Sequence, residues 1–211
     1  MILGVVPAGG RAERFNSYPK EMLPIRNDII LMEHSIKALQ LGGADLILII
    51  TSIEKIALHA RYFGAGLDFR VKYSDDLWKT LQMIFEYQAD EILYAMPDTY
   101  FPEDIFTRNS MKELDLNFGC FKTPTPSRFG VILNDKIYDK QSLPEGSYTA
   151  WGVISWTRTI SEYWRNGNFT SQPEALSKAM KEFGYSITLM EYYYDMANWE
   201  SYLSFIRRSV L

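Results

Sequence analysis

Short apolar runs alternate along the chain with stretches in which apolar residues recur every three or four positions. An apolar or β-branched run of four to eight residues is typical of a buried strand, and the three-to-four spacing is typical of an amphipathic helix. The predicted strands span residues 2–7, 46–51, 69–73, 92–96, 117–121, 129–133, 148–155 and 186–191. The predicted helices span residues 30–41, 55–63, 77–87, 102–114, 159–164, 173–183 and 199–208.

This alternation predicts an α/β fold, with a Rossmann-like sheet that is mixed but mainly parallel and has helices on both faces. Residues 122–150 differ in texture, because prolines, turn residues and short β runs replace the strand–helix rhythm. We interpret them as a small β-rich lobe that binds an acceptor and is inserted into a single domain spanning residues 1–211. No internal repeat or Gly/Ser/Pro-rich linker divides the chain.

The composition supports an ordinary globular protein. The 211 residues are 47% hydrophobic and 23% charged, which is enough for a sizeable core. Lys and Arg number 22 against 26 Asp and Glu, a net charge of −4, so we expect no nucleic-acid partner. The apolar start is too short to cross a membrane and lacks the basic flank of a signal peptide, so we expect no membrane association. Cys120 is the only cysteine, which fits a cytoplasmic location.

The most informative segment is the loop that follows the first predicted strand. Gly9 and Gly10 allow backbone N–H groups to approach a ligand closely, and the cations Arg11, Arg14 and Lys20 follow. Paired glycines after a strand, followed by cations, favour phosphate binding. The spacing is neither the Gly-x-Gly-x-x-Gly of dinucleotide-binding folds nor the Gly-Lys-Ser/Thr of a Walker loop, so both of those classes are excluded.

This loop resembles that of the sugar-1-phosphate nucleotidylyltransferase family, which includes glucose-1-phosphate thymidylyltransferase-like enzymes. The family motif runs Ala-Gly-Gly-x-Gly-Thr-Arg-Leu, followed by Pro-Lys-x-x-Leu-Pro. The corresponding segments here are residues 8–15 (AGGRAERF) and 19–24 (PKEMLP). Ala12 replaces the usual glycine and Glu13 the usual threonine.

The resemblance continues in the same order through the rest of the chain. Residues 96–101 (MPDTYF) resemble the family's acidic site at a strand end, 128–132 (RFGVI) its Tyr/Phe-Gly-Val strand, and 151–153 (WGV) the strand after the inserted lobe. Residues 194–202 (YDMANWESY) are similar to Asp-x-Gly-Thr-Pro-Glu-x-Tyr, with Ala197, Asn198 and Trp199 in place of Gly, Thr and Pro.

The resemblance implies Mg²⁺-dependent transfer of a nucleotidyl group from an NTP to a sugar 1-phosphate, which yields an NDP-sugar and pyrophosphate. It implies that the nucleotide is bound by Ala8, Gly9, Gly10 and Arg11, and that the catalytic residues are Arg14, Lys20, Asp98 and Lys140. It further implies that the sugar is bound by Gly130, Asp139 and Gly152, and that Mg²⁺ is held by Asp98 and Asp195. Each of these residues also has a purely structural interpretation. In it, Asp98 caps a helix, the glycines lie at a strand bulge, and the basic loop is exposed to water and binds no ligand.

The chemistry explains these residue types. The attacking phosphate is already dianionic near neutral pH, so no histidine base is needed, and we interpret His34 and His59 as structural. Two carboxylates at strand ends suit Mg²⁺, which takes its other ligands from phosphates and water. Positioning and neutralisation of charge would then supply most of the catalysis.

Other readings of the sequence stay open. The acceptor could be a polyol phosphate, a choline phosphate or another non-hexose phosphate, and the departures at Ala12 and Glu13 would also fit a non-catalytic nucleotide- or sugar-binding relative. The segment 73–78, where the family places its base-binding turn, has no glycine. Trp78 could stack on a base, but its spacing with Leu81 and Phe85 favours a helix. The nucleobase, the sugar and the oligomeric state cannot be read from the sequence.

Overall fold

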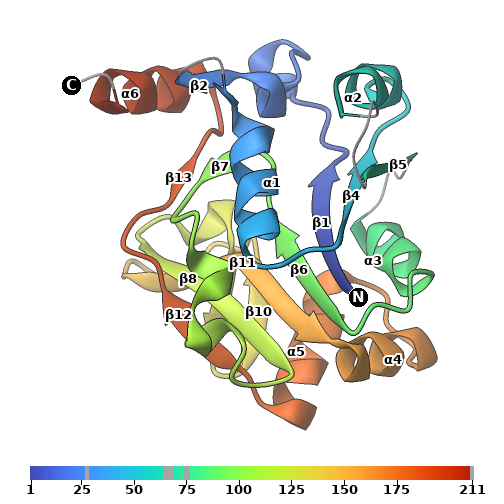
Figure 1. The fold of residues 1–211 in the computed structure, drawn as a ribbon. Helices are drawn as coiled ribbons and strands as arrows, with labels where there is room; N and C mark the ends of the chain where they lie inside the picture. The colour runs from blue at the N-terminus through green and yellow to red at the C-terminus, as the bar shows by residue number, and fades with distance from the viewer. Residues whose placement is uncertain (27–28, 64–68, 74–76, 210–211) are drawn as a thin grey trace.

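In the computed structural model, the described residues are 1–26, 29–63, 69–73 and 77–209. Within them a nine-stranded sheet has the order β10-β9-β11-β6-β1-β4-β5, while β8 pairs with β11 and with β12 (Figure 1). The strands are β1 (Ile2–Ala8), β4 (Leu46–Thr51), β5 (Phe69–Tyr73), β6 (Glu91–Ala95), β8 (Leu116–Thr123), β9 (Gly130–Leu133), β10 (Lys136–Asp139), β11 (Tyr148–Thr157) and β12 (Ser186–Leu189). Two short ladders join β2 (Pro24–Arg26) to β3 (Ile29–Ile30) and β7 (Thr99–Tyr100) to β13 (Tyr194–Asp195).

The centre of the sheet is parallel. Strands β5, β4, β1 and β6 run in one direction, and β11 pairs antiparallel with β6. Leu3, Val5 and Val6 of β1 are fully buried although they alternate between the two faces. A parallel strand needs such a near-continuous apolar run because helices cover both of its faces. The predicted α/β class, with its mainly parallel sheet and helices on both faces, is therefore confirmed.

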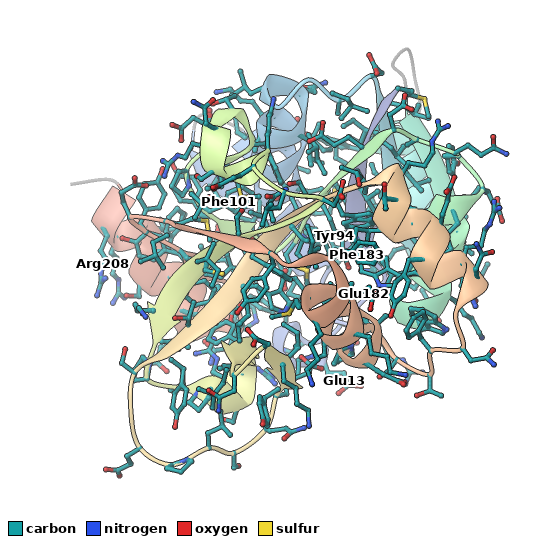
Figure 2. The ribbon with its side chains drawn as sticks, turned by 90° about the horizontal axis from the view of Figure 1, so that it is seen from below. Glu13, Tyr94, Phe101, Glu182, Phe183 and Arg208 are labelled. Carbon is teal, nitrogen blue, oxygen red and sulfur yellow. The ribbon has the colours of Figure 1, made fainter. Side chains whose placement is uncertain are left out.

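Six α-helices lie within the described residues. They are α1 (Leu31–Leu41), α2 (Ile56–Phe63), α3 (Leu77–Phe85), α4 (Arg158–Asn166), α5 (Gln172–Phe183) and α6 (Trp199–Ser209). α1 and α2 share one buried cluster with the sheet, and α3, α4 and α5 share a cluster on its other face. α6 packs beside β2, and its Arg208 is exposed at the periphery, whereas Tyr94 of β6 lies in the interior (Figure 2). None of these helices has the length and apolar character that crossing a lipid bilayer requires.

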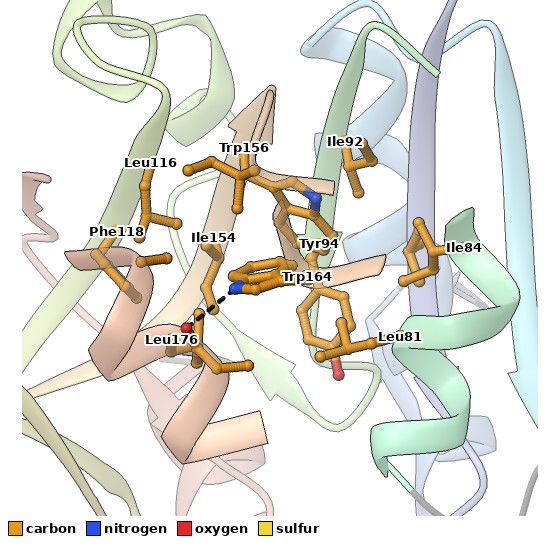
Figure 3. Packing of buried hydrophobic residues seen from close by; sticks show 14 of the residues in the cluster. Leu81, Ile84, Ile92, Tyr94, Leu116, Phe118, Ile154, Trp156, Trp164 and Leu176 are labelled. Atoms are coloured by element: carbon orange, nitrogen blue, oxygen red, sulfur yellow. Dashed lines mark hydrogen bonds between the residues drawn. The ribbon is translucent and has the colours of Figure 1, made fainter. Parts of the chain in front are cut away.

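Two tryptophans anchor α4 and α5 to the sheet. The Trp164 indole N–H donates to the carbonyl oxygen of Ala175 at 2.9 Å, and its ring lies 5.3 Å from that of Trp156 (Figure 3). The Trp156 N–H donates in turn to Ser161 Oγ at 2.9 Å. Both indoles can be buried at little cost because their only polar group finds a partner.

The segment interpreted as a β-rich insertion contains the β9–β10 hairpin. Asn134 and Asp135 connect the strands with φ angles of 50° and 56°. This left-handed pair matches the twist of a two-residue hairpin and is most accessible to Asn, Asp and Gly. Ile132 of β9 pairs with Thr149 of β11, so the hairpin extends the main sheet.

The predicted strands are all present, and six of the seven predicted helices are present with ends shifted by up to two residues. The helix predicted over residues 102–114 is wrong. Two 3-10 helices, η3 (Ile105–Thr107) and η4 (Asn109–Met111), replace it, and Arg108 between them is extended with ψ 135°. The Thr107 hydroxyl donates to the Asp104 carbonyl oxygen at 2.7 Å, a local bond that competes with continuation of a helix. The short strands β2, β3, β7, β10 and β13 were not predicted.

Candidate active site

The candidate site lies where β1 and β6 end. These strands are parallel neighbours, so their carboxyl ends lie at the same edge of the sheet. Gly9 follows β1 directly, and Asp98 lies in the turn between β6 and β7. Ligands of α/β proteins bind at this edge. The predicted phosphate-binding loop and the predicted strand-end aspartate therefore emerge together.

The β7–β13 ladder brings a distant carboxylate to the same place. Asp195 of β13 pairs with Thr99 of β7, and the Met196 amide donates to the carbonyl oxygen of Asp98 at 3.1 Å. The backbone thus holds Asp98 and Asp195 next to each other although they are far apart in sequence. Their side chains are largely buried, with 11% and 18% of their surface exposed.

Lys20 forms an ion pair with Asp98. Burial opposes the charge on the Lys20 ammonium, but Asp98, and more weakly Asp195 and Glu21, outweigh it and raise the pKa of Lys20. Lys20 follows the glycine loop, in the short 3-10 helix η2 (Lys20–Met22). An ammonium that stays charged at neutral pH therefore pairs with Asp98, in the segment that follows the glycine loop.

Arg128 is the partner of the second carboxylate, with its Nη2 atom 2.5 Å from Asp195 Oδ2. Burial raises the pKa of Asp195, the negative charge of Asp98 raises it further, and Arg128 and Lys20 offset only part of this. Because like charges raise each other's pKa only at short range, the effect of Asp98 on the pKa of Asp195 follows from the two carboxylates sharing one site. The sequence did not assign a role to Arg128, although it directly precedes the Phe-Gly-Val motif.

The carboxylate pair has the chemistry of a divalent-cation site. Asp98 and Asp195 offer oxygen ligands, which Mg²⁺ prefers, and a cation between them would relieve their repulsion. Over the described residues, no group of three or more His, Cys, Asp and Glu side chains could hold a metal ion. A cation here would accordingly need further oxygens from phosphates and water, as Mg²⁺ commonly does.

The glycine loop is open to solvent. No atom lies within 4 Å of the position that a Cβ would occupy on Gly10, and Arg11 and Arg14 are exposed. The contacts that define the carboxylate pair do not include these two arginines. Ala12, at the usual glycine position, has φ 53° and ψ 35°, the left-handed conformation. An L-residue adopts this conformation at a cost that glycine avoids.

A buried ionic cluster beneath the loop was missed by sequence reasoning. Lys55 Nζ donates to Glu21 Oε1 at 2.6 Å and to the carbonyl oxygen of Ala8 at 2.5 Å, and His59 Nε2 lies 3.2 Å from the same Glu21 oxygen. Burial opposes the Glu21 charge, but His59 and Lys55 outweigh it and lower the pKa of Glu21. The cluster fastens the end of β1 to the segment that carries Lys20. The four-residue spacing of Lys55 and His59 could have placed both on one helix face.

Gly130 and Gly152, the predicted sugar-binding glycines, lie against aromatic rings of the protein. A Cβ on Gly130 would overlap the Trp151 indole, and a Cβ on Gly152 would overlap the Tyr193 ring. These close approaches require glycine, and the protein's own rings fill the space. The role of these two glycines in letting the backbone approach a sugar ring stays a prediction.

Asp139 and Lys140 lie at the end of the β9–β10 hairpin, exposed to solvent. Asp139 pairs with Gly130, and the Lys140 amide donates to the carbonyl oxygen of Phe129 at 3.0 Å. Phe129 directly follows Arg128, which pairs with Asp195. The backbone hydrogen bond from Lys140 to Phe129 is therefore what relates the end of the hairpin to the carboxylate pair. No side-chain contact in the described residues links either one to Asp98 or Asp195.

Trp78 lies in α3, partly buried against the core, and its ring meets that of Phe169 edge-on at 6.0 Å. This supports the helical interpretation of Trp78. The stretch 74–76 of the predicted base-binding turn lies outside the described residues.

His34 is buried, with Nε2 2.8 Å from the Phe101 carbonyl oxygen, and burial lowers the pKa of His34.

The chain matches no protein-family model and no curated protein. Among solved structures it is similar to a Bacillus anthracis protein that is provisionally described as a glucose-1-phosphate thymidylyltransferase and was solved in complex with a sucrose. The TM-score is 0.85, the sequence identity is 18%, and the match covers 99% of this chain and 95% of the other. At this identity the comparison shows that the two chains share one fold over nearly their whole lengths.

Proposed function

We propose that the protein transfers a nucleotidyl group from an NTP to a sugar 1-phosphate. An oxygen of the sugar phosphate attacks the α-phosphorus of the NTP and forms a new P–O bond. The bond between the α-phosphorus and the bridging oxygen breaks, and that oxygen leaves with the pyrophosphate. The products are an NDP-sugar and pyrophosphate, and no proton transfer is needed because the attacking phosphate is already ionised.

The observation that carries this proposal is the convergence of Lys20, Asp98 and Asp195 beside the glycine loop. Joining two polyanions requires cations at the reacting phosphates and carboxylates that can hold a metal ion. The similarity in fold to a protein described as a sugar nucleotidyltransferase supports the same chemistry.

Each residue has a role in this proposal. The backbone of Ala8, Gly9 and Gly10 would receive the triphosphate, with Arg11 assisting. Arg14 would bind the departing pyrophosphate, and Lys20 would contact phosphate oxygens close to the reacting phosphorus. The exposed positions of the two arginines leave them free to reach a ligand.

Asp98 and Asp195 would hold Mg²⁺, in keeping with their all-oxygen donor set. When bound, Mg²⁺ supplies neutralisation of the phosphate charge. Lys20 and Arg128, which pair with these carboxylates in the structure, would then be released to contact phosphate oxygens.

On the acceptor side, the family resemblance assigns the sugar phosphate to Lys140 and the sugar hydroxyls to Asp139, both of which are exposed.

The proposal is tested by incubating the protein with each NTP, a panel of hexose 1-phosphates and polyol phosphates, and Mg²⁺, and by measuring pyrophosphate. We expect release that depends on one NTP, one phosphate acceptor and the metal. Absence of pyrophosphate across the whole panel, with a protein whose thermal unfolding shows that it is folded, would contradict the proposal.

A further inference from the structure

A cavity of about 280 Å³ opens beside Asp195. Its walls come from residues 121–129, 193–195 and 201–208, which belong to the end of β8, the segment leading to β9, β13 and α6. No lining residue among those described belongs to the glycine loop or to the segment that carries Lys20. The cavity therefore offers a ligand site next to the carboxylate pair that is separate from the proposed triphosphate site.

The charges lining this cavity favour an anion. Three cations line the cavity: Lys122, Arg128 and Arg208. The one carboxylate among the described lining residues is Asp195, which already pairs with Arg128. The Lys122 ammonium donates to the neutral Thr149 hydroxyl at 2.8 Å, so its charge is not cancelled by that bond. The lining thus keeps an excess of positive charge.

A larger cavity, of about 460 Å³, provides a contrast. Its two cations are both engaged by carboxylates: Lys37 pairs with Glu103, and Arg108 pairs with Asp104 and Glu191. With three carboxylates against two cations, that cavity has no preference for an anion.

The shape and walls of the smaller cavity suit a phosphorylated sugar or polyol. Phe121 stacks on Tyr193 with ring centroids 3.9 Å apart and planes at 9°, and the Arg128 guanidinium lies 5.4 Å from the Phe129 ring centre. Phe121 and Tyr193 cover each other's stacked faces, so these rings give the cavity an apolar wall for the carbon skeleton of a ligand but no open ring face. The exposed Ser204 offers a hydroxyl to the cavity, whereas Thr123 and Thr125 bond to each other and Ser201 donates to the carbonyl oxygen of Asn198.

We propose that this cavity binds the phosphate monoester of the acceptor, with Arg128 and Arg208 contacting the phosphate and the aromatic wall contacting the carbon skeleton. The inference rests on the proposed function and deepens it. Because Arg128 also contacts Asp195, a phosphate bound to Arg128 lies next to the carboxylate pair. Lys140 does not line the cavity, so the phosphate is assigned to cations other than the one that the family resemblance implied.

The test is calorimetric titration of the nucleotide-free protein with glucose 1-phosphate, inorganic phosphate and glucose. Arg208→Gln removes a lining cation, and Arg207→Gln removes the neighbouring exposed cation on the same helix, which does not line the cavity. We expect Arg208→Gln to weaken glucose 1-phosphate binding at least about tenfold, the scale of one lost charged hydrogen bond. Arg207→Gln should leave the affinity within about twofold of the unaltered protein.

The binding proposal is overturned if none of the phosphates binds, if glucose binds as tightly as glucose 1-phosphate, or if the two arginine substitutions have equal effects. These outcomes are separable from failure of the proposed function. If pyrophosphate is released and Arg208→Gln leaves the KM for the acceptor unchanged, the proposed binding site is rejected and the proposed reaction stands. Selective binding without pyrophosphate release would keep the cavity and reject the reaction.

Discussion

Asp98 lies beside Asp195 because the amide that follows Asp195 donates a hydrogen bond to the Asp98 carbonyl oxygen at 3.1 Å. Each carboxylate has its own cation, Lys20 for Asp98 and Arg128 for Asp195. Two cations therefore face two carboxylates in this group, and their charges balance. A polyphosphate would therefore bind more favourably together with a divalent cation, which offsets two of the negative charges that it brings.

Replacing Lys20 tests the proposed contact with the triphosphate. We expect Lys20→Gln to lower kcat on the order of 10²- to 10³-fold, because a charge that stabilises the transition state is lost. Lys181→Gln, on the exposed side of α5, is the matched control and should leave kcat unchanged. Steady-state kinetics of the two variants decide the point, and equal activity in both would remove Lys20 from the site.

The buried Glu21–Lys55 pair predicts a stability that depends on pH. Glu21→Gln leaves the Lys55 charge buried without its anion, so we expect a loss of about 3 kcal/mol in the free energy of unfolding at pH 7. The pKa of Glu21 is lowered in the folded state, so its stabilising effect is present above the ordinary value of 4.5 and is lost as the pH falls through the lowered pKa. The difference between the two proteins should therefore shrink in acid.

Urea unfolding at several pH values measures this difference. Glu86→Gln is the control, because the exposed Glu86 pairs with Lys72 at the surface and its loss should change stability little. A difference between Glu21→Gln and the unaltered protein that stays constant from pH 7 down to pH 3 would show that the Glu21 charge does not stabilise the fold.

The left-handed conformation of Ala12 predicts a stabilising substitution. Ala12→Gly should raise the free energy of unfolding by about 1 kcal/mol, since glycine adopts φ 53° without a steric cost. Chemical denaturation provides the measurement. A fall in stability would mean that the loop does not hold this conformation in solution.

Adding the same methyl group at two glycines should change the stability of the protein by different amounts. Gly152→Ala should destabilise the protein by about 1 to 3 kcal/mol, because the new Cβ would overlap the partly buried Tyr193 ring. Gly10→Ala should change stability by less than about 0.5 kcal/mol, because the space around it is open. Thermal unfolding of both variants tests the contrast, and equal shifts would refute the packing of Tyr193 on Gly152.

The main elements of the fold could be predicted because burial on both faces leaves a direct pattern in the sequence. β1 and β4 are continuous apolar runs, and the helices repeat apolar residues at three-to-four spacing. The segment 102–114 has the same spacing, yet it folds into two 3-10 helices, because apolar periodicity does not report local side-chain bonds such as that from Thr107 to Asp104. Two-residue strands such as β7 and β13 carry no periodicity at all.

The candidate site was predictable only where a residue follows a strand or belongs to a motif. Asp98 and Lys20 could be named in this way, and the structure places them in contact. The Arg128–Asp195 pair and the Glu21–Lys55 pair depend on contacts between distant segments, which the local pattern cannot report. The sequence also could not predict which rings pack on the two glycines, Trp151 on Gly130 and Tyr193 on Gly152. A glycine in a strand indicates that some group approaches the backbone closely, but it does not identify that group.

The most direct test of the account compares pyrophosphate release by the unaltered protein and by Asp98→Asn, each supplied with the NTP and phosphate acceptor that the panel identifies and titrated with Mg²⁺. We predict that the substitution lowers kcat on the order of 10²-fold or more, raises the Mg²⁺ concentration needed for half-maximal activity, and shifts the melting temperature by only a few degrees. Unchanged kcat and an unchanged Mg²⁺ requirement in the folded variant would contradict the account.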